Sequence, residues 1–164
     1  MILQYLENVI LLFQQIVYRS NQVLITDVEL LPFINNMVTK KNVNGASLIM
    51  SAHIIVKSID PNGYPMSISK LSLIHLLKQK LHFEGVIVSD ALNMRGLTTF
   101  LEKRNKIDRS TPGSRKINEK VASYFAALEG GNDLLLDSSF SAKCSNGELN
   151  IIRNKLLSII RKDT

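Results

Sequence analysis

Three short apolar runs constrain the fold of this chain more than any other feature of its sequence. The runs cover residues 46–52 (ASLIMSA), 85–89 (GVIVS) and 133–136 (DLLL). Such runs are typical of parallel strands that are buried on both faces, although periodicity alone does not separate them from buried helices. The glycines at or before the runs, Gly45, Gly85 and Gly131, favour the strand interpretation.

Segments with a helical spacing of apolar residues lie before, between and after these runs. They cover residues 27–38, 67–81, 117–128 and 151–160. Ser67 or Ser69 is the expected cap of the second helix. The expected buried faces of the second and third helices are Leu71, Ile74, Leu77 and Leu81, and Val121, Phe125 and Leu128. Strands that alternate with helices predict a parallel sheet of βαβ units, and therefore an α/β fold.

The charge of the chain is modestly basic. Its 164 residues carry 20 basic and 14 acidic side chains, for a net charge of +6. The basic residues are scattered, and the densest cluster is Lys103, Arg104, Lys106 and Arg109. A solvated loop explains this cluster better than a nucleic-acid site, because no recognised nucleic-acid motif accompanies it. We therefore expect no nucleic-acid partner.

Residues 1–28 form a segment of their own in this interpretation. Apolar residues recur there at amphipathic-helix spacing, but polar residues such as Glu7 and Gln14 interrupt them. The segment fits neither a secretory signal nor a membrane span, so a cytoplasmic location is the default expectation. The single cysteine, Cys144, excludes an intrachain disulfide and a cysteine-only zinc site.

Candidate chemical groups follow the ends of the predicted strands, where α/β folds place their working residues. The positions are His53, Ser89, Asp90 and Asp137. Asp90 could act as nucleophile, general base or metal ligand, or it could cap a following helical turn. His53 could be a ligand, a proton shuttle or a structural hydrogen-bonding group. Asn132 and Asp133 lie at the N-terminal end of the third run, and we expect them to bind backbone groups.

Several motifs carry a resemblance to a known family. The segment LHFEGVIVSDALNMRGL, residues 81–97, resembles the nucleophile signature of the glycoside hydrolase family 3 N-terminal catalytic domain. Its SDALNM portion resembles the β-N-acetylhexosaminidase branch. Further motifs agree in order: ELLPF at residues 29–33, LIMSAHI at 48–54, DPNGYPMSISKLSLIHLLKQKL at 60–81 and ALEGGNDLLL at 127–136.

The resemblance implies a partial (β/α)8 TIM barrel, roughly strands six to eight with their helices, over residues 29–164. It also implies retaining hydrolysis of terminal β-N-acetylglucosamine, in which a carboxylate forms a covalent glycosyl-enzyme. Asp90 would be the catalytic nucleophile, and His53 and Met94 would bind the substrate. The implied partner is a carbohydrate, and no metal or other cofactor is implied.

The sequence departs from the family pattern in one important respect. The hexosaminidase branch carries a KHFPGHGDT-like segment that supplies the acid/base, and no such segment occurs in these 164 residues. Three strands also cannot close a barrel and would leave exposed edges. We therefore expect impaired hydrolysis, with a complementary upstream half-chain as a candidate partner. The alternative is a non-catalytic remnant or an interaction or sugar-binding module.

Overall fold

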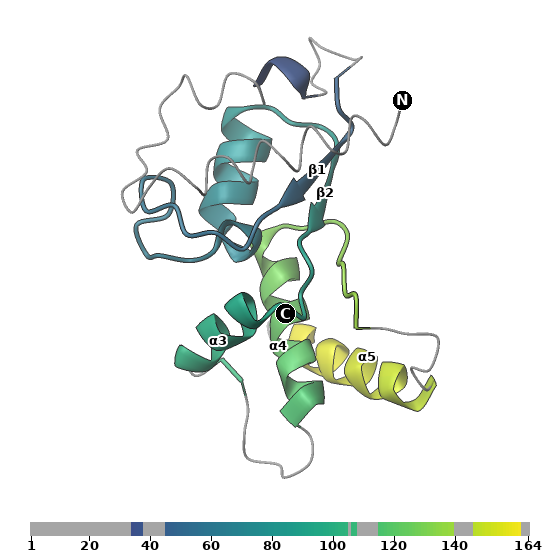
Figure 1. Cartoon of the computed structure of the whole chain (residues 1–164). Coiled ribbons are helices and arrows are strands. Elements are labelled where there is room, and N and C mark those ends of the chain that lie inside the picture. The colour runs from purple at the N-terminus through teal and green to yellow at the C-terminus, as the bar shows by residue number, and fades with distance from the viewer. Residues whose placement is uncertain (1–33, 38–44, 105, 108–114, 140–145, 162–164) are drawn as a thin grey trace. The chain divides into compact units, whose positions relative to one another are not determined.

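The computed structural model describes residues 34–37, 45–104, 106–107, 115–139 and 146–161. The elements, in chain order, are β1 (Leu48–Ser51), η1 (Met66–Ile68), η2 (Leu71–Lys80), β2 (Val86–Ser89), α3 (Arg95–Lys103), α4 (Arg115–Gly130) and α5 (Asn146–Ile160) (Figure 1). The chain divides into two compact units. Unit 1 comprises Met1–Asp90 with Ala127–Leu134, and unit 2 comprises Ala91–Ala126 with Leu135–Thr164.

The first two predicted strands exist and are parallel. β1 and β2 pair in register from Leu48 with Val86 to Ser51 with Ser89, and the intervening chain forms the η1 and η2 helices. This arrangement is a βαβ unit, as the alternation of runs predicted. The mixed α/β class is therefore confirmed.

The third predicted strand is reduced to a single parallel bridge between Val88 and Leu134. Two backbone hydrogen bonds form this bridge: Leu134 donates its N–H to the Ile87 carbonyl, and its carbonyl accepts from the Ser89 N–H. Asp133 meanwhile uses its own side chain to bind the Ile87 N–H. The prediction for residues 133–136 was right in direction and wrong in length, because the bridge is not extended into a strand.

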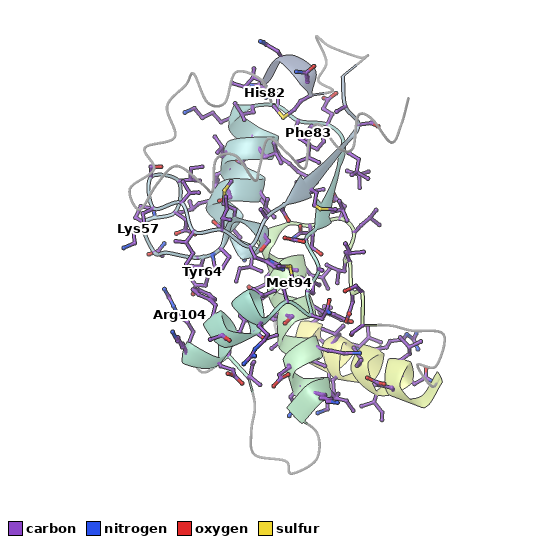
Figure 2. The ribbon with its side chains drawn as sticks, in the orientation of Figure 1. Lys57, Tyr64, His82, Phe83, Met94 and Arg104 are labelled. Atoms are coloured by element: carbon purple, nitrogen blue, oxygen red, sulfur yellow. The ribbon has the colours of Figure 1, made fainter. Side chains whose placement is uncertain are left out.

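The core of unit 1 lies on one face of the sheet. Its buried cluster consists of Met37, Ile49, Leu73, Phe83 and Ile87, with Leu77 and Leu81 packed against it. Helix η2 runs beside the two strands and covers this face (Figure 1). Figure 2 labels Phe83, the residue of this buried cluster that lies between η2 and β2.

The opposite face of the sheet is less covered than the sequence predicted. Leu48, Met50 and Val88 are only partly buried, and Val86 is 39% exposed. We expected both faces to be buried, as in complete parallel sheets. That expectation is wrong for this face, since strand alternation sends every second side chain away from η2.

Helix η2 winds more widely than the sequence suggested. Its N-cap is Lys70, without a side-chain cap bond, but the Ser69 hydroxyl one residue earlier accepts the Ser72 N–H at 3.2 Å. Of the two predicted caps, Ser69 rather than Ser67 therefore bonds the first turn. The helix is a π-helix, and its end carries an i to i−5 bond from Leu81 to Leu76. Its most buried side chains are Ser72 and Leu73, and the face predicted from α-helical spacing is only partly buried. The wider winding accounts for this difference.

Unit 2 contains α3, α5 and most of α4. Buried positions of α4 include Val121 and Tyr124, whereas Leu128 in the predicted buried face is 41% exposed. The predicted apolar stripe of α4 is therefore right for Val121 and wrong for Leu128, while Phe125 is partly buried. Lys120 pairs with Glu148 at 3.2 Å, and this contact joins α4 to α5.

Candidate functional site

Asp90 and His53 both follow the carboxyl ends of the paired strands in unit 1. Asp90 comes directly after β2, and its backbone N–H donates to the Ser51 carbonyl at 2.9 Å. His53 lies two residues beyond the end of β1. The pairing therefore brings the segments that carry these two residues to one edge of the sheet. Asp90 does not occupy the N-cap of α3, which is Met94.

The His53 ring is held by a buried serine. Its Nδ1 lies 2.5 Å from the Ser67 Oγ, and Ser67 on η1 has no exposed surface. Sequence reasoning considered Ser67 only as a helix cap and missed this contact. The sequence offers no local signal for this contact, because the two residues are 14 positions apart and meet only once the chain folds back after β1.

A buried polar network lies beneath this edge of the sheet. Asn132 donates from Nδ2 to the carbonyls of Ser67 and Ala127, each at 2.7 Å. Its Oδ1 accepts from the Ser51 hydroxyl at 2.8 Å. Ser51, Ser67 and Asn132 are all at most 5% exposed. The expectation that Asn132 binds backbone groups is confirmed, whereas the role of Ser51 was missed.

Asp133 has a structural role in the same unit. Its Oδ2 accepts the Ile87 N–H at 2.8 Å, and Lys78 Nζ lies 3.0 Å from both oxygens. Burial raises the pKa of Asp133, but the hydrogen bonds from Ile87 and Lys78 and the lysine charge outweigh it. The net pKa lies below its ordinary value of 3.8. Asp133 thus binds a backbone group, as predicted.

This depressed pKa predicts a pH-dependent contribution to stability. A carboxyl group whose pKa falls on folding stabilises the folded chain above its unfolded pKa, and that stability is lost as pH falls through the folded pKa. Between about pH 5 and about pH 3, we expect Asp133→Asn to lose less unfolding free energy than the unmodified chain. Urea unfolding at both pH values measures this. Glu129→Gln, which alters the exposed pair with Lys70, is the control and should keep the pH dependence of the unmodified chain. An equal change in unfolding free energy between the two pH values in all three chains would contradict the assignment.

Asp137 and Met94 belong to unit 2. The Tyr124 hydroxyl and the Ser139 N–H and hydroxyl donate to the Asp137 carboxylate. Burial raises the pKa of Asp137, but these hydrogen bonds and the charge of Lys120 bring it below 3.8. Met94 is 46% exposed where α3 begins (Figure 2). The structure therefore assigns Asp137 a full set of local hydrogen bonds, and it leaves the Met94 side chain accessible.

Neither metal-binding clusters nor spanning helices are found in the described part of the chain. No group of three His, Cys, Asp or Glu side chains is placed to hold a metal ion there. No helix in the described ranges combines the length and apolar character needed to cross a membrane. His75, which we left out of the candidate site, is exposed and contacts Gln79.

Comparison with known proteins identifies the family. A β-hexosaminidase of Shewanella frigidimarina is 46% identical over 48 residues, which cover 29% of this chain and 14% of that protein. The chain thus spans about one seventh of that relative. The structure is similar to the β-N-acetylglucosaminidase from Thermotoga maritima, with a TM-score of 0.53, 21% identity and coverage of 82% of this chain and 24% of that one.

A fungal multi-domain family 3 β-N-acetylglucosaminidase gives a TM-score of 0.57 at 18% identity, over 82% of this chain and 13% of that one. At these identities the structural likeness concerns the fold, which in the family is of the TIM-barrel type. The model of the glycosyl hydrolase family 3 N terminal domain matches residues 15–143, more than half of the chain. The chain therefore belongs to the glycosyl hydrolase family 3 N-terminal domain family.

Proposed function

We propose that this chain supplies the nucleophile and part of the sugar site of a retaining β-N-acetylhexosaminidase. The Asp90 carboxylate attacks the anomeric carbon of a terminal β-N-acetylglucosamine, forms a glycosyl ester and releases the aglycone oxygen. Water then attacks the same carbon and regenerates the carboxylate. The observation that carries the proposal is the position of Asp90, which directly follows β2 beside the last residue of β1. Catalytic residues of barrel enzymes occupy this end of the strands.

His53 and Met94 are the proposed substrate contacts. His53 offers a ring N–H for a sugar oxygen, and its fixed contact with Ser67 favours a defined ring orientation. Met94 offers an accessible apolar side chain, which can pack against the carbon-bonded hydrogens of a sugar ring. Both roles follow from the family resemblance and from the exposure of these groups.

We also propose that residues 29–164 correspond to strands six to eight of a (β/α)8 barrel, with residues 1–28 as a separate segment. The parallel β1 and β2 strands and the parallel bridge at Leu134 support this assignment. The family match begins at residue 15, so the boundary at residue 28 stays a prediction.

The proposed enzyme needs an acid/base from outside these 164 residues. The three histidines are His53, His75 and His82, and none lies in a GHGD-like sequence. A missing proton donor lowers the rate by roughly 10²–10⁴ when the leaving group must be protonated. The half-covered sheet face around Val86 supports a complementary half-chain as the source, because parallel strands are normally covered on both sides.

The test compares two N-acetyl-β-glucosaminides on the purified chain. The dinitrophenolate leaving group of the first substrate departs without a proton, whereas the methanol leaving group of the methyl glycoside requires one. We expect the chain alone to cleave only the dinitrophenyl glycoside, and a chain carrying the upstream half of a family 3 domain to restore methyl glycoside cleavage. Equal cleavage of both by the chain alone would place an acid/base within it. No cleavage and no sugar binding by the folded chain would favour the non-catalytic alternative.

A further inference from the structure

Hydrogen bonds to both backbone groups of Ser67 hold this residue, and therefore its hydroxyl, in place. The Ser67 N–H donates to the Ala52 carbonyl at 3.0 Å, and Ala52 directly precedes His53. The Ser67 carbonyl accepts from Asn132 Nδ2 at 2.7 Å. Since Ser67 is held on both sides and has no exposed surface, its Oγ can shift little relative to the His53 backbone.

The same hydroxyl constrains which ring nitrogen of His53 carries the proton. Its contact with His53 Nδ1 is 2.5 Å, and within the described residues the Ser67 Oγ has no second hydrogen-bond partner. If Nδ1 carried the proton, the buried Ser67 O–H would have no acceptor, which is costly. The arrangement that gives the Ser67 hydroxyl an acceptor has Ser67 donating to Nδ1, so that the neutral ring carries its proton on Nε2.

We propose that Ser67 is a positioning residue that holds neutral His53 as the Nε2–H tautomer. Asn132 and Ser51 anchor it: Asn132 binds the Ser67 carbonyl, and Ser51 at the end of β1 donates to Asn132 Oδ1. On the proposed function, the Nε2–H of His53 is then a hydrogen-bond donor for an oxygen of the bound sugar. Only the contact with the sugar rests on the proposed function, because the tautomer is a property of the chain without sugar.

Long-range ¹H–¹⁵N NMR of the uniformly labelled full chain tests the proposal directly. At about pH 8, above the ordinary histidine pKa of about 6.5, the His53 signals of the unmodified chain should show the Nε2–H pattern. Ser67→Ala should reduce the ratio of Nε2–H to Nδ1–H by roughly threefold to tenfold, the effect of one ordinary hydrogen bond. Ser67→Thr keeps the hydroxyl and should keep the ratio.

Ser69→Ala is the matched control. Ser69 is also buried, but its hydroxyl donates to Asp60 at 2.6 Å instead of contacting His53. Its variant should leave the His53 pattern unchanged. A proton on Nδ1 in the unmodified chain would overturn the proposal, even if Ser67→Ala does not fold. An unchanged ratio in folded Ser67→Ala would overturn it as well. Titration with N-acetylglucosamine separates the two claims: absent binding with the Nε2–H pattern intact would contradict the proposed function and leave the tautomer assignment standing.

Discussion

Asp90→Asn is expected to abolish release of dinitrophenolate from 2,4-dinitrophenyl N-acetyl-β-glucosaminide. The amide keeps the shape of the carboxylate but cannot form the glycosyl ester. The rate should fall by about 10³-fold or more, since loss of a catalytic nucleophile typically lowers kcat by at least that order. The activated substrate is chosen because its leaving group needs no proton, so the assay reports the nucleophile separately from the acid/base. The measurement is the absorbance of dinitrophenolate over time.

Asp137→Asn provides the control for this prediction. Asp137 was selected from the sequence by the same positional rule as Asp90, but its oxygens accept from Tyr124 and Ser139. An asparagine oxygen at the Oδ1 position can still accept both bonds from Ser139, and the Tyr124 hydroxyl can accept from the amide NH2 instead of donating. The variant should therefore retain its rate within about threefold, the effect of a minor local change. A large loss in Asp137→Asn, with Asp90→Asn unaffected, would transfer the nucleophile assignment to Asp137.

Asn132→Ala is expected to cause a large loss of stability in unit 1. It removes two bonds to buried carbonyls and the acceptor of the Ser51 hydroxyl. Each buried polar group left without a partner costs about 1–3 kcal/mol, and partial relaxation makes about 2–4 kcal/mol the expected total. Urea unfolding at neutral pH measures this value.

Asn93→Ala is the comparison for Asn132→Ala. The Asn93 Oδ1 also accepts two bonds, from the Ser138 N–H at 3.3 Å and the Ser138 hydroxyl at 3.0 Å, but both residues are exposed. Water can replace these bonds, so the loss should stay within about 0.5 kcal/mol. Similar losses in the two variants would mean that the network around Asn132 contributes little beyond an ordinary surface contact.

Much of unit 1 could be predicted from the sequence because its signals are local. The apolar runs at β1 and β2, separated by a helical segment, were sufficient to predict a parallel pair. Asn132 and Asp133 were correctly expected to bind backbone groups, because they lie at the N-terminal end of the third run, opposite the end where α/β folds place their working residues. The position of Asp90 directly after β2 followed from the end of the second apolar run.

The remaining features depend on contacts between distant parts of the chain. No local pattern indicates that Ser67 meets His53, because the contact needs the loop after β1 to return beside the strand. The buried face of η2 was predicted only in part. Leu77 and Leu81 pack against the core, but α-helical spacing does not apply to the π-helical winding and missed Ser72 and Leu73. Leu128 was placed in the buried face of α4, but Ala127 is the buried residue there and Leu128 is 41% exposed, since apolar spacing shows a stripe but not which neighbour covers it.

The measurement that tests the central claim most directly is the identification of the residue that carries the sugar. The purified chain is mixed with 2,4-dinitrophenyl N-acetyl-β-glucosaminide, quenched in acid during the reaction, digested and mapped by mass spectrometry. A glycosyl-enzyme on Asp90 predicts one added N-acetylhexosaminyl group on that residue, and its absence from Asp90→Asn. Release of dinitrophenolate with the sugar on another residue, or on none, would contradict the assignment of Asp90 as the nucleophile.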